Sequence, residues 1–153
     1  MTNRSTRTAS DYAIDGMTPN NVVKPASVEE LQQTLKDLSN EGLTAIPWGG
    51  GTRIALGNTP KTFDTALDLT GLDNVIAHNP GDLTVTVEAG LTMAKLGTLL
   101  AEHGQFLAID PPLPDRATVG GTLAIGTAGP LKWQYGNPRD LVIGMSVVQS
   151  DGT

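Results

Sequence analysis

Hydrophobic positions recur with helical spacing in two stretches of this chain. Between residues 28 and 38 an apolar side chain appears every three or four positions, and Ser27 and Glu30 have the spacing of a capping box, with Gly42 as a left-handed stop. A second stretch begins at Thr92, runs to about His103 and ends before Gly104. The pattern therefore predicts one helix over 27–42 and another over 92–103.

Other stretches are extended in pattern, and one of them, 83–88, alternates apolar and polar side chains as a half-buried strand does. The turn sequence Asn79-Pro80-Gly81-Asp82 separates two of them and predicts a hairpin. Asp151-Gly152 is a further strong turn signal at the end of the last apolar stretch. The predicted strands are 22–25, 43–47, 65–69, 75–78, 83–88 and 141–150.

The first residues carry little of either pattern. Residues 1–20 are mostly polar, and the sequence predicts a disordered tail there. At the other end, a buried strand that stops in a turn with no return partner predicts a fragment of a longer protein.

Composition narrows the function classes. The chain has 153 residues, 39% of them hydrophobic, which suits one soluble globular domain with a modest core. Its net charge of −6 disfavours general binding to nucleic acid or an acidic membrane. It has no cysteine, so a disulfide, a cysteine-held metal centre and a thiol nucleophile are excluded, and redox chemistry would need a cofactor. No apolar run approaches the roughly 20 residues of a spanning helix and no secretory signal is present, so we expect a cytoplasmic protein.

Three successive glycines follow the predicted strand 43–47. Without side chains, consecutive amide N–H groups of Gly49, Gly50 and Gly51 can converge on one anion, with Thr52 adding a hydroxyl and Arg53 a positive charge. A plain tight turn is an equal alternative for this segment taken alone. The residue order excludes the P-loop and the Rossmann fingerprint. If the loop is a phosphate nest, Gly50→Val should fill it and abolish binding with little change in helix content.

A second segment rich in small residues spans 117–140, with glycines paired at 120 and 121. Such a loop lets backbone approach a large flat ligand closely, and its alternative is a glycine-rich loop packed between layers.

Taken together, the two glycine segments resemble one family. Pro47 to Thr52 and Ala117 to Gly121 are similar to the two pyrophosphate motifs of the FAD-binding (PCMH-type) domain that vanillyl-alcohol oxidase, p-cresol methylhydroxylase and the glycolate and lactate dehydrogenases share. The stretch Tyr135 to Asp140 also resembles that family. Trp48 and the run 67–73 most resemble the FAD-binding subunit of glycolate oxidase.

The resemblance implies an α+β fold of two α/β subdomains, 21–74 and 75–153, the second incomplete, with FAD extended between them. It implies that pyrophosphate contacts come from Gly49, Gly50, Gly51, Thr52, Arg53, Thr118, Gly120 and Gly121. It implies that Ala128, Gly129 and Tyr135 lie toward the ribityl chain or the flavin ring.

The function implied is that of an FAD-dependent oxidoreductase acting on a small 2-hydroxy acid such as glycolate, with hydride passing to flavin N5. No catalytic residue and no metal ligand is assigned, because the family takes its catalytic groups from regions beyond residue 153, and the fragment alone is expected to be inactive. The implied partners are a second flavin subunit and an iron–sulfur subunit. Two alternatives remain open, namely a UDP-N-acetylenolpyruvoylglucosamine reductase-like flavoenzyme and a non-catalytic scaffold subunit.

The two histidines lie outside both glycine segments, which predicts noncovalent FAD. We interpret His78 as an ordinary strand residue and His103 as a favourable charge at a helix end.

Overall fold

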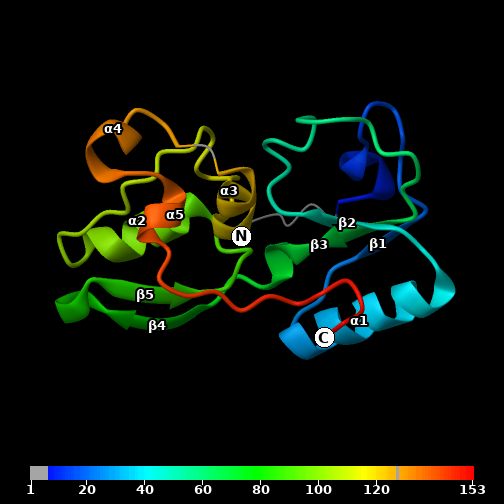
Figure 1. Cartoon of the computed structure of the whole chain (residues 1–153), viewed down its shortest axis with the longest axis horizontal. Coiled ribbons are helices and arrows are strands. Elements are labelled where there is room, and N and C mark those ends of the chain that lie inside the picture. The colour runs from blue at the N-terminus through cyan, green and yellow to red at the C-terminus, as the bar shows by residue number, and fades with distance from the viewer. Residues whose placement is uncertain (1–6, 127) are drawn as a thin grey trace, which may run out of the picture.

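The computed structural model describes residues 7–126 and 128–153, and it has an α+β fold, as expected. Three parallel strands form one sheet in the order β1-β3-β2 (Figure 1). They are β1 (Asn21–Val23), β2 (Ala45–Trp48) and β3 (Thr65–Asp68). The register pairs Val23 with Leu67 and Trp48 with Asp68, so the carboxyl ends of β2 and β3 meet. All four residues of β3 are buried because this strand is central.

Helix α1 (Val28–Glu41) connects β1 to β2 and covers one face of the sheet. The Ser27 hydroxyl accepts a hydrogen bond from the Glu30 amide, and Gly42 ends the helix at a φ of 68°. Leu31 of α1 packs on Leu67 of β3. The sequence prediction for this helix is confirmed to within one residue at each end.

The opposite face of the sheet is covered by the N-terminal segment, so the predicted tail is wrong for residues 7–20. A short 3₁₀ helix, η1 (Ala9–Tyr12), is followed by a bridge between Ile14 and Met17. Tyr12 and Ile14 are buried in one cluster with Trp48 and Phe63. Two apolar side chains within a polar stretch thus suffice to anchor it. Residues 1–6 lie outside the described residues.

The other half of the molecule is built on the predicted hairpin. Strands β4 (Val75–Asn79) and β5 (Thr84–Val87) pair antiparallel around the 3₁₀ turn η3 (Pro80–Asp82), and the 3₁₀ turn η2 (Leu69–Gly71) leads into them. Helix α2 (Met93–Ala101) packs its leucines on β5. The division of the chain at residue 74 stays a prediction.

Part of the segment predicted as a second glycine loop is helical. Helix α3 (Val119–Ile125) is capped by Thr118 and ends at Gly126, and two single-turn helices follow, α4 (Lys132–Tyr135) and α5 (Pro138–Leu141). Low helix propensity at a glycine pair is overridden here by the Thr118 cap and by packing.

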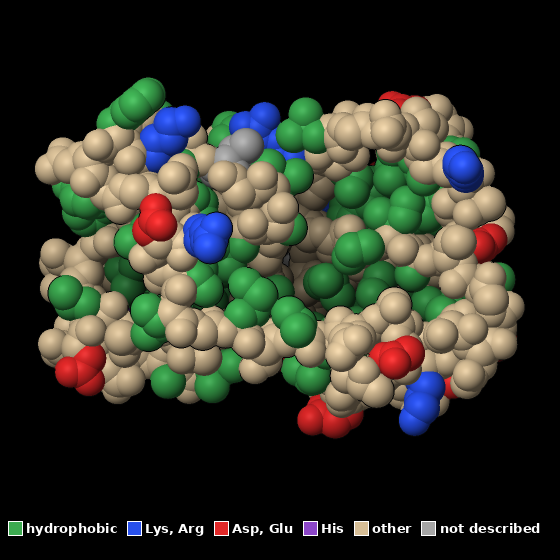
Figure 2. All heavy atoms as spheres, viewed as in Figure 1, with side chains coloured by type: hydrophobic (Ala, Val, Ile, Leu, Met, Phe, Trp, Pro, Cys, Tyr) green, Lys and Arg blue, Asp and Glu red, His purple; other side chains and the backbone are tan. Residues whose placement is uncertain are grey.

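The predicted strand 141–150 is not formed. Residues 142–149 run without regular structure from the α5 side to α1, as the red segment in Figure 1 shows, and only the turn near Asp151 is as predicted. No neighbouring strand within the described residues offers a ladder partner, and a β pattern cannot be realised without one. Ile143, Met145 and Val147 are consequently exposed. Apolar side chains gather along this path in the space-filling view (Figure 2).

Candidate functional site

The glycine loop begins where β2 ends, at the carboxyl edge of the parallel sheet. Gly51 has a φ of 68°, a left-handed conformation that breaks the extended chain. Within the part of the chain that the structure describes, the amides of Gly50, Gly51, Thr52 and Arg53 donate no hydrogen bond to protein. This row of uncommitted donors is the donor set that an anion such as phosphate requires.

A buried network at the carboxyl end of β3 holds the start of this loop. The Tyr12 hydroxyl donates to the Asp68 carboxylate at 2.5 Å, and the Tyr12 ring meets the Trp48 ring edge-on at 5.1 Å between centroids. Asp68 also accepts from the backbone amide and the hydroxyl of Thr70, at 2.9 and 2.6 Å. Trp48, the residue before the glycines, therefore packs on a tyrosine ring that Asp68 holds in place.

The same network shifts two pKa values. Burial raises the pKa of Asp68, but hydrogen bonds from Thr70 and Tyr12 and the charge of Lys24 together bring this pKa below its ordinary value. Burial and the Asp68 carboxylate raise the pKa of Tyr12 to about 12. Asp68 is thus ionised and Tyr12 neutral at pH 7.

The two glycine motifs meet, although 65 or more residues separate them. The Arg116 guanidinium donates to the Gly50 carbonyl oxygen at 3.1 Å. A Cβ atom added at Gly50 would overlap the Arg116 carbonyl oxygen, and one added at Gly49 would overlap the Thr118 hydroxyl. Glycine is therefore needed at Gly50 because the Arg116 backbone lies close to it, and at Gly49 because the Thr118 side chain does.

In the second motif, the amides of Gly120 and Gly121 are already committed to protein acceptors. The Gly120 amide donates to the Ala89 carbonyl at 2.8 Å, and the Gly121 amide donates to the Thr118 hydroxyl at 3.2 Å. A Cβ atom at Gly120 would lie 2.8 Å from the Ala89 Cβ. These bonds support the packing alternative for Gly120, and the predicted pyrophosphate contacts of this pair stay predictions.

The structure does not bring the remaining predicted residues to the glycine loop. Tyr135 lies on α4 with its ring edge-on to Phe106 at 5.6 Å, and a Cβ at Gly129 would overlap the Asp110 carboxylate. Ala128 precedes Gly129 and is half-buried. In Figure 1, α4 lies in the half of the molecule opposite β2. Their predicted role near the flavin stays a prediction.

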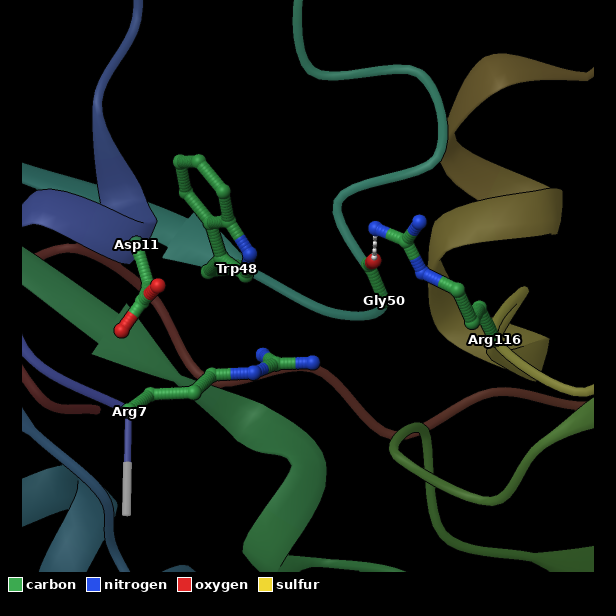
Figure 3. Close-up of a pocket in the computed structure, with 5 residues that line it drawn as sticks. All are labelled: Arg7, Asp11, Trp48, Gly50 and Arg116. Carbon is green, nitrogen blue, oxygen red and sulfur yellow. Dashed lines mark hydrogen bonds between the residues drawn. The ribbon is translucent and has the colours of Figure 1, made fainter. Parts of the chain in front are cut away.

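A pocket of about 360 Å³ opens beside the glycine loop and is lined by Arg7, Asp11, Trp48, Gly50 and Arg116 (Figure 3). The sequence prediction missed both arginines of this pocket. Arg7 lies in the segment taken for a tail, and nothing in its surroundings signals it. Arg116 stands two residues before Thr118 and was detectable as the one basic side chain beside the second motif. Arg53, the predicted cation, is exposed and does not line the pocket.

The contact at Gly50 also corrects the expected effect of Gly50→Val. A valine side chain there collides with the Arg116 backbone, so it disturbs the fold where the two motifs meet, not the loop alone. That substitution cannot separate loss of binding from loss of structure.

The histidines lie together in the other half of the molecule. The rings of His78, on β4, and His103, just beyond α2, meet edge-on at 5.1 Å between centroids. The predicted strand position of His78 is confirmed, and its Nε2 lies 3.4 Å from the Gln105 Oε1. In the described ranges, no group of three or more His, Asp or Glu side chains is arranged to hold a metal ion. None of the helices there is long and apolar enough to cross a membrane.

A glycine loop at the carboxyl edge of a parallel sheet, with free amides and two arginines beside it, defines a domain that binds a phosphate-containing cofactor. The profile of the family described as FAD binding domain matches residues 19–153. This chain belongs to that family, as the resemblance of its motifs indicated.

Relatives with assigned names have the same domain. The chain is 33% identical over 134 residues to the mitochondrial D-lactate dehydrogenase [cytochrome] of Arabidopsis thaliana, covering 88% of this chain and 23% of the relative. It is 27% identical over 134 residues to the glycolate oxidase subunit GlcD of Bacillus subtilis, covering 88% of this chain and 28% of the subunit. The chain thus spans about a quarter of the length of these relatives.

Solved structures show the same fold. Berberine bridge enzyme in complex with (S)-reticuline matches with a TM-score of 0.72 and 24% identity, over 86% of this chain and 26% of the enzyme. An alkyldihydroxyacetonephosphate synthase matches with a TM-score of 0.69 and 27% identity, over 78% of this chain and 24% of the synthase.

The residues present fit an FAD diphosphate. The ligand offers only acceptor oxygens at its centre, and the loop offers the uncommitted amides of residues 50–53 with two guanidinium groups nearby. When bound, FAD would supply the redox chemistry that a chain without cysteine lacks.

Proposed function

We propose that this chain is the FAD-binding part of an oxidoreductase that acts on a small 2-hydroxy acid such as glycolate, and that it holds FAD noncovalently. The observation that carries the proposal is the row of amides at residues 50–53 that have no protein partner, at the point where the two glycine motifs meet.

The substrate class is inferred from relatives. The names of matched proteins specify D-lactate, D-2-hydroxyglutarate and glycolate, which are all 2-hydroxy acids. Because the chain spans about a quarter of these proteins, the substrate-binding groups belong to the remainder of the enzyme. GlcD is named as a subunit, which supports our further proposal of a second flavin subunit and an iron–sulfur subunit as partners. We also propose that the protein is cytoplasmic.

The chemistry divides between cofactor and protein. Bound flavin would accept a hydride from the α-carbon of the hydroxy acid. The part of this chain is to bind and orient: the amides of residues 50–53 hold the diphosphate, and Trp48, locked by Tyr12, fixes the loop that presents them. Binding of the diphosphate by these amides would position the cofactor, and the amides themselves would take no part in the hydride transfer.

The available side chains support the proposal of noncovalent attachment. The chain has no cysteine, and its two histidines pack against one another in the β4–β5 half of the molecule. Neither histidine lines the pocket beside the glycine loop.

The test is reconstitution of the purified chain with FAD, followed by gel filtration and a visible absorption spectrum. We expect a yellow protein that releases all of its flavin into the filtrate after acid denaturation. Flavin that stays with the denatured protein would contradict noncovalent binding. A colourless protein that refuses FAD would favour the scaffold alternative. In the full-length enzyme, anaerobic bleaching by glycolate but not by its methyl ester tests the substrate class.

A further inference from the structure

The pocket beside the glycine loop gathers charge from three separate segments. Arg7 and Asp11 come from the N-terminal segment, Trp48 and Gly50 from the end of β2, and Arg116 from the approach to α3. Figure 3 shows the Arg7 guanidinium directed toward the loop at Gly50, which Arg116 approaches from the other side. Residues about 110 positions apart thus bring two guanidinium groups to one cavity.

The carboxylates near these arginines are already hydrogen-bonded. Asp11 accepts from the Thr8 amide at 2.6 Å, and Asp68 accepts from Tyr12 and Thr70. The Arg7 guanidinium lies 3.7 Å from Asp68, which is an ion pair without hydrogen-bonding distance.

Donors therefore outnumber acceptors in the pocket. A guanidinium carries five N–H donors, and the bond from Arg116 to the Gly50 carbonyl uses one of them. The uncommitted amides of residues 50–53 add further donors at the same loop. A ligand that presents acceptor oxygens and negative charge complements this arrangement, in a chain whose overall charge is −6.

We propose that Arg7 and Arg116 bind the diphosphate of a nucleotide from opposite sides of the glycine loop, with the amides of residues 50–53 as the third set of donors. This inference rests on the proposed FAD site and names the residues that give it positive charge. The glycine motifs carry no such charge in the pocket, and Arg53 does not line it. A diphosphate fits better than the single carboxylate of a hydroxy acid, because one guanidinium suffices for a carboxylate and this pocket brings two.

The test is a titration of the intact chain with FAD, monitored by quenching of flavin fluorescence, for wild type, Arg7→Gln, Arg116→Gln and Lys61→Gln. Loss of one charged hydrogen bond predicts a roughly 10- to 100-fold weaker affinity for the Arg7 and Arg116 variants. Lys61→Gln is the control, since it removes the same charge from an exposed side chain outside the pocket, and we expect less than a threefold change. Affinity of wild type should fall with added salt, and more steeply than that of the two pocket variants.

Inorganic diphosphate is the second probe, measured by calorimetry, and it separates the two proposals. If wild type binds FAD and both pocket variants bind it equally well, the arginine assignment is overturned and the FAD proposal stands. If wild type binds diphosphate through both arginines but refuses FAD, the site stands and the FAD proposal falls. If wild type binds neither probe, both are wrong.

Arg116→Gln also removes the hydrogen bond to the Gly50 carbonyl oxygen. The unfolding midpoint of this variant in urea is therefore measured together with its affinity. Arg116→Lys keeps the charge, and we expect it to recover part of the lost affinity if charge is what the ligand requires. Arg7→Gln remains decisive if Arg116→Gln fails to fold, because the Arg7 side chain is 38% exposed. Its unfolding midpoint is also measured, since Arg7 pairs with Asp68 and lies over the Tyr12 ring.

Discussion

Tyr12 joins the N-terminal segment to the site, because it contacts both Asp68 and Trp48. Its hydroxyl donates the hydrogen bond that the buried Asp68 receives across 56 positions of sequence. We predict that Tyr12→Phe lowers the free energy of unfolding by about 1–3 kcal/mol, because a buried carboxylate loses a donor. Urea unfolding measures this. Tyr135→Phe, where the ring is exposed, is the control and should change little; equal effects would contradict the buried bond.

The raised pKa of Tyr12 adds a dependence on pH. A tyrosine whose pKa is about 12 when folded and about 10 when unfolded contributes stability that is complete below pH 10. This contribution is lost as the pH rises through the folded value. We predict that the stability difference between wild type and Tyr12→Phe shrinks between pH 10 and 12. Unfolding curves at each pH measure this difference. A difference that stays constant over this range would show that folding does not raise the pKa of Tyr12.

Gly50 lies too close to the Arg116 backbone to carry a side chain. We predict that Gly50→Ala destabilises the chain by about 1–3 kcal/mol even without ligand, since the new Cβ overlaps the Arg116 carbonyl. Gly97→Ala is the matched control on the exposed side of α2, where a Cβ meets nothing within 4 Å, and it should stabilise by about 0.5–1 kcal/mol. Thermal unfolding compares the two. Equal stability of both variants would mean that the motifs do not meet at Gly50.

At the scale of elements, the sequence predicted those whose signals are local. Helix α1 has its capping residues and its glycine stop within one segment, and the β4–β5 hairpin has a turn between two alternating stretches. The sequence did not predict helix α3, because Gly120 lowers helix propensity. A glycine is needed at this position because Gly120 lies against Ala89, about 30 positions earlier. The anchoring of Tyr12 was missed for the same reason, since its partners Trp48 and Asp68 are remote.

The N-terminal segment is the element whose removal tests this account. We predict that deleting residues 1–17 costs about 3–6 kcal/mol of stability, because two buried side chains, Tyr12 and Ile14, leave the core. It should also shift tryptophan emission to the red, since Trp48 is 4% exposed in the intact chain. Trp133, already 87% exposed, contributes a constant background. The control deletes residues 1–6 only; if the longer deletion behaves like it, the segment is not part of the core.

At the scale of the whole molecule, the candidate site exists only because two halves with separate cores meet. The first half supplies the free amides of the loop, and the second supplies Arg116 and Thr118, which touch Gly50 and Gly49. The sequence suggested this meeting only through resemblance, because no local pattern determines which loops will pack together. It gave no indication of Arg7, whose place follows from the packing of η1 on the sheet.

The C-terminal segment exposes several large apolar side chains. Ile143 is 87% exposed and Val147 is 70% exposed, on backbone with no strand partner in the described residues. Exposed, unpaired chain of this kind associates with copies of itself.

We therefore predict concentration-dependent self-association of the chain, and its reduction by the double variant Ile143→Lys with Val147→Lys, measured by sedimentation velocity. The double variant Ser146→Lys with Gln149→Lys adds the same charge to exposed polar positions of the same segment and separates lost apolar contact from added repulsion. Equal dispersal by both pairs would assign the effect to charge alone. Wild-type chain that stays monomeric at high concentration would show that the exposed side chains drive no association.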